Sequence, residues 1–182
     1  TQEIINCIKS ESFEGISGIL SVSPYYNKPQ PKGIYLHYKT IASASPVPII
    51  LYNVPGRTGS NIDADTTLQL AHDFDNIVAI KEASGNLIQI GRIIRDKPKN
   101  FSVISGDDAL TIPMMALGAK GVISVTANAF PEEFSTMVRL ALKDKFEDAA
   151  KIHFDLMEIM DTLFEDGSPG GIKAALQIMD LA

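Results

Sequence analysis

Cysteine is almost absent from this 182-residue chain, which contains only Cys7. One cysteine excludes an internal disulfide framework and is compatible with a reducing compartment, so we expect a cytoplasmic protein. No apolar run approaches the ~20 residues that a membrane-spanning helix needs, and no signal-peptide pattern opens the chain. We therefore expect neither a disulfide-stabilised secreted protein nor an association with membranes.

Positive charge and nucleotide-binding motifs are also scarce. Sixteen Lys and Arg residues face 22 Asp and Glu residues, and no basic stripe is present, which argues against a nucleic-acid partner. Neither Gly-x-Gly-x-x-Gly nor Gly-Lys-Ser/Thr occurs, so a nucleotide cofactor is not expected. His37, His72 and His153 all lie in segments with helical spacing, so the sequence predicts no metal site.

What the chain does have is a repeated pattern of short apolar strands. Five such segments end at polar or functional residues spaced 19 to 29 residues apart: Ser23, Tyr52, Lys81, Ser105 and Ser124. Each interval holds one helix, which predicts an α/β fold with a parallel sheet. Because polar residues follow every strand, and not only those at one switch point, we favour part of a (β/α)₈ TIM barrel over a doubly wound open sheet.

After Ala129 the strand pattern stops and three helices are expected, from Pro131, Phe146 and Ser168. We therefore predict that residues 1–145 form the C-terminal part of a barrel and residues 146–182 a helical C-terminal extension. Five strands are fewer than a closed barrel needs, and the residues after Thr1 resemble the inside of a helix. We expect the natural N-terminus, with roughly 80 to 90 residues of barrel, to lie upstream.

Lys81 ends the most apolar strand, Ile77–Ile80. Its ammonium could reach solvent at the strand end, or desolvation could lower its pKa until the amine attacks a carbonyl. Tyr52 ends the preceding strand and should face the same rim, as a proton relay or as a packing residue. Glu82 should point to the opposite side and contact a helix. Arg57, in a loop with proline and glycines, could hold a carboxylate or form a surface ion pair.

Five motifs together carry a resemblance through essentially the whole chain. They are Pro24-Tyr25-Tyr26-Asn27, Tyr52-Asn53-Val54-Pro55-Gly56-Arg57-Thr58-Gly59, Ile80-Lys81-Glu82-Ala83-Ser84-Gly85-Asn86, Ser105-Gly106-Asp107-Asp108 and Gly121-Val122-Ile123-Ser124-Val125-Thr126-Ala127-Asn128. In this order they resemble the 4-hydroxy-tetrahydrodipicolinate (dihydrodipicolinate) synthase family. The resemblance implies a (β/α)₈ barrel of which this chain holds about strands 4 to 8, followed by a helical extension.

The resemblance also implies a lyase that condenses pyruvate with L-aspartate 4-semialdehyde, on the route to diaminopimelate and lysine. Lys81 would form a covalent imine with pyruvate without another cofactor, which requires its pKa to fall by some 2 to 3 units. Tyr52 and Tyr26 would be the other catalytic residues. Tyr26 would reach a neighbouring subunit of a homodimer or homotetramer. Arg57, Ile123 and Gly106 would bind the substrates.

Some family features have no counterpart in residues 1–182. The threonine pair of the proton relay is missing, and only Tyr25 matches the lysine feedback site. We therefore expect residues 1–182 alone to be inactive or weak. Two alternatives stay open: an N-acetylneuraminate lyase or keto-deoxy-sugar aldolase of the same superfamily, and a catalytically incomplete fragment or binding subunit.

Overall fold

The computed structural model describes residues 1–181 and divides into two compact units, the first comprising Thr1–Ile104 and the second beginning at Ser105. Each unit has its own buried apolar residues. The first unit holds nearly all of the sheet and the residues that the sequence assigns to covalent chemistry. The second is mainly helical.

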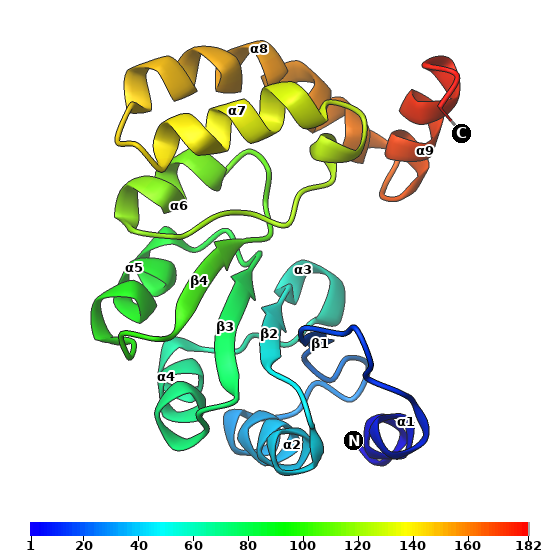
Figure 1. The fold of residues 1–182 in the computed structure, drawn as a ribbon, viewed down its shortest axis with the longest axis vertical. Helices are drawn as coiled ribbons and strands as arrows, with labels where there is room; N and C mark the ends of the chain where they lie inside the picture. The colour runs from blue at the N-terminus through cyan, green and yellow to red at the C-terminus, as the bar shows by residue number, and fades with distance from the viewer. Residues whose placement is uncertain (182) are drawn as a thin grey trace. The chain divides into compact units, whose positions relative to one another are not determined.

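The sheet has four strands in the order β1-β2-β3-β4, as Figure 1 shows. The strands are β1 (Ile19–Val22), β2 (Ile49–Asn53), β3 (Ile77–Glu82) and β4 (Ser102–Ser105). The helices of the first unit are α1 (Gln2–Ser10), α2 (Pro31–Ala44), α3 (Pro55–Thr58), α4 (Ala64–Asp73) and α5 (Leu87–Asp96). β1 pairs with β2 and β2 with β3 in parallel, so the prediction of an α/β fold with a parallel sheet is confirmed.

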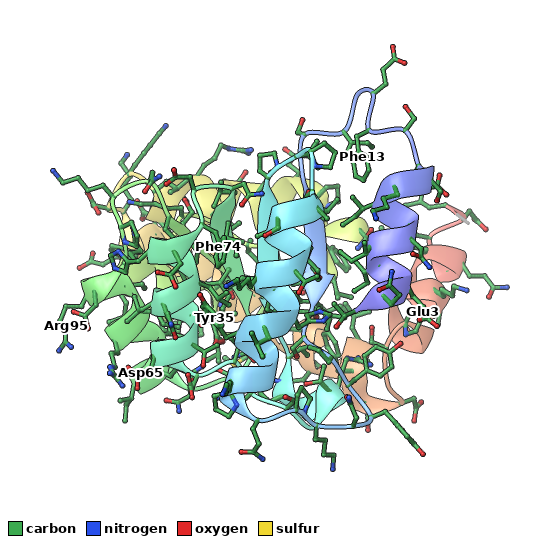
Figure 2. The ribbon with its side chains drawn as sticks, turned by 90° about the horizontal axis from the view of Figure 1, so that it is seen from below. Glu3, Phe13, Tyr35, Asp65, Phe74 and Arg95 are labelled. Atoms are coloured by element: carbon green, nitrogen blue, oxygen red, sulfur yellow. The ribbon has the colours of Figure 1, made fainter. Side chains whose placement is uncertain are left out.

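Apolar side chains of the strands and of α2, α4 and α5 form the first core. Its largest fully buried members are Ile34, Tyr38, Ile41, Ile49, Leu51, Ile62, Leu70, Ile80, Ile90 and Ile93. Burial of each contributes about 1.5–3 kcal/mol to folding before the entropy cost. Among the outer helices, α4 contacts both α2 and α5. Figure 2 labels Tyr35 of α2 and Phe74 after α4, whose ring centroids lie 6.2 Å apart.

Local sequence explains where these helices begin. Pro31 occupies the first turn of α2, where its missing N–H leaves no hydrogen bond unmade. The carboxylate of Asp63 accepts the N–H of Thr66 and caps α4. The side chain of Asn86 accepts the N–H groups of Ile88 and Gln89 and caps α5. The helices α2, α4 and α5 thus begin where a proline or a capping side chain favours a helix start.

A register shift between β2 and β3 places their functional ends. Ile49 lies opposite Ile77, whereas Ile50 lies opposite Ala79, so Val78 is an additional residue in β3. Such a β-bulge changes which side chains face each other beyond it. As a result, Tyr52 lies opposite Lys81 and Asn53 opposite Glu82.

The second unit contains α6 (Thr111–Leu117), the 3₁₀ helix η1 (Thr126–Asn128), α7 (Pro131–Ala141), α8 (Phe146–Glu165) and α9 (Gly170–Ile178). Phe134, Met137, Leu156, Met160 and Leu163 are among its buried side chains. The helices expected from Pro131 and Phe146 are confirmed, and the third begins at Gly170, two residues later than expected.

The fifth strand predicted at residues 121–125 is wrong. This segment forms only an isolated parallel bridge between Val122 and Ser105. Directly afterwards, the carboxylate of Asp108 accepts the N–H groups of Val125, at 3.1 Å, and Thr126, at 2.7 Å. Because these donors bind a side chain, they are not used in a strand ladder, and the chain turns into η1.

Candidate active site

Lys81 and Tyr52 form the centre of the candidate site. They are directly paired residues of β3 and β2, so their side chains leave the same face of the sheet. The Lys81 Nζ atom lies 4.3 Å from the centroid of the Tyr52 ring, within the range of a cation–π contact. Both side chains are partly exposed, which leaves the amine and the phenol within reach of a small molecule.

The phenol of Tyr52 is held in its protonated form. Burial raises its pKa above the ordinary value of 10.0, and the positive charge of Arg57 lowers it by a smaller amount. A neutral phenol can both donate and accept a hydrogen bond. Next to an amine, it is therefore suited to pass protons to and from a reacting group.

Arg57 lies on the short helix α3, at the C-terminal end of β2 (Figure 1). The segment was expected to be a loop, but Pro55 starts one helical turn, and Gly59 ends it in a left-handed conformation with φ of 64°. The Arg57 side chain is exposed, so its guanidinium is available to a ligand. The Lys28 side chain lies over Gly59, where an added Cβ would approach its Cε to 2.7 Å. The segment after Tyr26 thus contacts the segment after Arg57.

Among the predicted site residues with large apolar or aromatic side chains, Tyr26 is the most exposed. Its side chain is 94% exposed, and its φ of 67° lies in the left-handed region that non-glycine residues rarely adopt. Tyr25 beside it is also exposed. The chain therefore presents two neighbouring phenols to the outside on a strained turn.

Gly106 and Ile123 lie side by side in the second unit. They follow the bridged residues Ser105 and Val122, and the N–H of Ile123 donates to the Ser105 carbonyl at 2.9 Å. Ile123 is exposed. Asp108 fixes the next turn through Val125 and Thr126, and its second carboxylate oxygen is buried without a hydrogen-bond partner among the described residues.

Asp107 and Asp108 act on the protein backbone. Asp107 accepts the N–H of Leu110 just before α6. Within residues 1–181, no group of three or more His, Cys, Asp and Glu side chains is arranged to hold a metal ion. The same part of the chain has no helix that is both long and apolar enough to cross a bilayer.

Sequence reasoning missed Asn53. It is fully buried and donates to Glu82 at 2.6 Å, on the face of the sheet opposite the Tyr52–Lys81 pair. Glu82 also accepts from Gln89 of α5 at 2.8 Å, so the prediction that Glu82 contacts a helix is confirmed. Alternation of side chains along a strand could have placed Asn53 beside Glu82. Asn53 follows Tyr52 and Glu82 follows Lys81, so both point to the face opposite that pair.

The model of the dihydrodipicolinate synthetase family matches residues 1–182. The chain is 56% identical over 179 residues to a 4-hydroxy-tetrahydrodipicolinate synthase of Parabacteroides distasonis, covering 98% of this chain and 60% of that protein. The chain thus spans about three fifths of the length of the curated relatives it matches.

Solved structures agree with this match. The chain resembles the crystal structure of dihydrodipicolinate synthase from Aquifex aeolicus with a TM-score of 0.90 and 45% identity, over 92% of this chain and 57% of the other. It resembles the chloride-inhibited enzyme from Acinetobacter baumannii, complexed with pyruvate, with a TM-score of 0.94 and 39% identity, over 99% and 62% of the two chains. The chain belongs to the dihydrodipicolinate synthetase family.

Proposed function

We propose that the protein catalyses the condensation of pyruvate with L-aspartate 4-semialdehyde to 4-hydroxy-tetrahydrodipicolinate, through an imine on Lys81. The observation that carries the proposal is the placement of Lys81 Nζ over the Tyr52 ring, on paired ends of parallel strands. A relative at 39% identity has been crystallised with pyruvate, which supports pyruvate as the first substrate.

In the proposed reaction, the unprotonated amine of Lys81 adds to the keto carbon of pyruvate. Tyr52 passes protons so that the carbinolamine oxygen leaves as water and an imine forms. Loss of a proton from the methyl carbon gives an enamine, whose carbon attacks the aldehyde of the semialdehyde, and the aldehyde oxygen takes up a proton to become the 4-hydroxyl group. The amino group of the semialdehyde then displaces the Lys81 amine from the imine carbon, which closes the ring and releases Lys81. No cofactor is needed, because the imine nitrogen accepts the electron pair.

The other site residues have proposed roles in substrate binding. Arg57 grips the carboxylate of the semialdehyde, which its exposed guanidinium can bind bidentately. The backbone at Ile123 holds the pyruvate moiety, and Gly106 lies near the second substrate. Tyr26 completes the proton relay of a neighbouring subunit in a homodimer or homotetramer, and its 94% exposure supports a role outside its own chain.

The same proposal covers the larger architecture. Residues 1–145 would contribute about strands 4 to 8 of a (β/α)₈ barrel, and residues 146–182 a helical extension. The long helix α8, which begins at Phe146, supports this boundary. Because the matched relatives are longer, we propose that the complete protein is active and that residues 1–182 alone turn over weakly or not at all. Full turnover by purified 1–182 would contradict the second statement.

Borohydride reduction tests the covalent step. The full-length protein is incubated with pyruvate, reduced with borohydride and digested for peptide mass analysis. We expect a pyruvate-derived adduct on the peptide that contains Lys81, and none in the Lys81→Arg variant. An unmodified Lys81 in folded, full-length protein would refute the mechanism.

Steady-state kinetics test the role of Arg57. In Arg57→Lys the charge remains but the planar fork is lost, so KM for the semialdehyde should rise about tenfold or more, while KM for pyruvate stays unchanged. The matched control is Arg92→Lys, on the exposed surface of α5, where the side chain pairs with Asp65. An equal rise of both KM values in Arg57→Lys would contradict the role.

A further inference from the structure

Behind the Lys81–Tyr52 pair lies a buried polar cluster formed by Asn53, Glu82 and Gln89. Asn53 and Glu82 are fully buried, and the Asn53 side chain donates to the Glu82 carboxylate at 2.6 Å. The Gln89 side chain, on α5, donates to the same carboxylate oxygen at 2.8 Å. The N–H of Ser84 donates to the other oxygen at 3.1 Å.

Asn53 ties the cluster to the segment before α4. Its side-chain oxygen accepts the N–H of Ile62 at 2.9 Å, and its side-chain nitrogen also donates to Asn61 at 2.9 Å. The Glu82 carboxylate therefore joins the end of β2, the turn after β3 and the first turn of α5, and Asn53 connects it to the segment before α4.

The three donors that satisfy Glu82 are neutral amides. A buried carboxylate loses its hydration, and an apolar side chain of similar size would usually favour folding at least as much. A polar cluster at this position is better explained by a requirement for one defined geometry than by stability. Fully satisfied buried networks specify such a geometry, because any displacement leaves a donor or an acceptor unpaired.

The geometry in question is that of the reacting pair. Tyr52 and Asn53 are consecutive in β2, Lys81 and Glu82 are consecutive in β3, and the register pairs Tyr52 with Lys81 and Asn53 with Glu82. The hydrogen bond on one face thus fixes the two strand ends that carry the amine and the phenol on the other face. Both strand ends lie at the last pairs of the ladder.

We propose that Glu82 is a positioning residue that, through Asn53 and Gln89, sets the orientation of Lys81 against Tyr52. This inference rests on the proposed function, because it assigns the cluster a role in imine chemistry at Lys81. A displacement of about 1 Å of a reacting group can cost about 100-fold in rate.

The test uses the full-length protein with the variants Glu82→Gln and Gln89→Met. In Glu82→Gln an NH₂ group replaces an acceptor oxygen and must face a donor. We expect kcat to fall about 10- to 100-fold with KM for pyruvate changed less than about threefold, and borohydride trapping at Lys81 to slow in parallel. In Gln89→Met the donor to Glu82 is lost together with the hydrogen bonds of Gln89 to Asn61 and to the Ile62 carbonyl, and kcat should fall about three- to tenfold.

The matched control is Asn76→Ala, which removes a side-chain hydrogen bond to the Ala42 carbonyl next to the opposite end of β3. It should lower the thermal unfolding temperature but leave kcat and the trapping rate unchanged. Values of kcat within twofold of the parent in both cluster variants would overturn the inference. An equal loss of kcat in Asn76→Ala would overturn it as well, because the loss would then follow stability and not the geometry of the cluster. If Glu82→Gln does not fold, Gln89→Met decides. A parent protein that pyruvate and borohydride leave unmodified would instead refute the proposed function itself.

Discussion

The hydroxyl and the ring of Tyr52 make separable contributions that two substitutions can distinguish. Tyr52→Phe removes only the oxygen and keeps the ring under the Lys81 amine, at 4.3 Å from its centroid. Tyr52→Leu removes both. If the phenol is the proton relay, the Phe variant should lose the general acid–base contribution, about 100- to 10,000-fold in kcat, which corresponds to about 2.7–5.5 kcal/mol in the activation barrier.

The ring contributes a smaller, electrostatic amount. A cation–π contact between the ring and the protonated Lys81 amine at this distance is worth about 0.5–2 kcal/mol. Tyr52→Leu loses this contact, which orients the amine, so its kcat/KM for pyruvate should fall by up to about a further 30-fold. Because Phe keeps this contact, KM for pyruvate should stay close to that of the parent in Tyr52→Phe. The two effects therefore appear in different kinetic parameters.

Steady-state kinetics with both substrates, together with borohydride trapping at Lys81, provide the assay. Tyr35→Phe is the matched control, since it removes a phenol that donates to Asp73 at 2.8 Å on the exposed surface of α2. Its kcat should be unchanged. A Tyr52→Phe variant with kcat within threefold of the parent would refute the assignment of Tyr52 as the proton relay.

Three further predictions concern folding. Gly59→Ala should destabilise the protein by about 1–2 kcal/mol in urea denaturation, because φ is 64° and the new Cβ would meet Lys28; unchanged stability would contradict the observed turn. Burial lowers the pKa of His37 from 6.5 to about 4, so the unfolded chain takes up a proton at a higher pH than the folded chain does. The free energy of unfolding should be constant above pH 6.5 and fall by up to about 1.4 kcal/mol per pH unit toward pH 4. His37→Leu should lose this dependence. Equal free energies of unfolding of the parent protein at pH 7 and pH 5, from urea denaturation, would contradict it. Asp108→Ala should lower the free energy of unfolding by about 2–4 kcal/mol in thermal denaturation, because the N–H groups of Val125 and Thr126 lose their acceptor. A loss below about 1 kcal/mol would show that water replaces the carboxylate.

Local signals predicted most of the secondary structure. The helix starts at Pro131 and Phe146 follow from local sequence and were predicted, whereas the sequence leaves Asp63 and Asp65 as equal candidates for the cap of α4, and the structure shows Asp63. The apolar, β-branched stretch before Lys81 likewise identified β3. The same reasoning failed at residues 121–125, where an equally apolar stretch forms one bridge, because a distant carboxylate, Asp108, takes the N–H groups that follow.

The site was predictable in its residue types but not in its internal geometry. Lys81, Tyr52 and Arg57 were identified because an amine, a phenol and a guanidinium at strand ends are unusual and belong to a recognised motif set. The exposure of Tyr26 and its left-handed backbone could not be read from composition or spacing. Alternation along the strands places Asn53 on the face of Glu82, but the hydrogen bond between them depends on the register of β2 and β3, which the sequence does not give.

The sequence by itself determined the alternation of strands and helices, the helix caps and the presence of a lysine at the end of a buried strand, because these depend on residues close together in the chain. Only the tertiary structure decided that Tyr52 faces Lys81. Without the bulge at Val78, the register of β2 and β3 would shift by one residue and place Tyr52 opposite Ile80. Register is set by packing and hydrogen bonds between strands, such as the contact of Asn53 with Glu82, and those partners lie 29 residues apart.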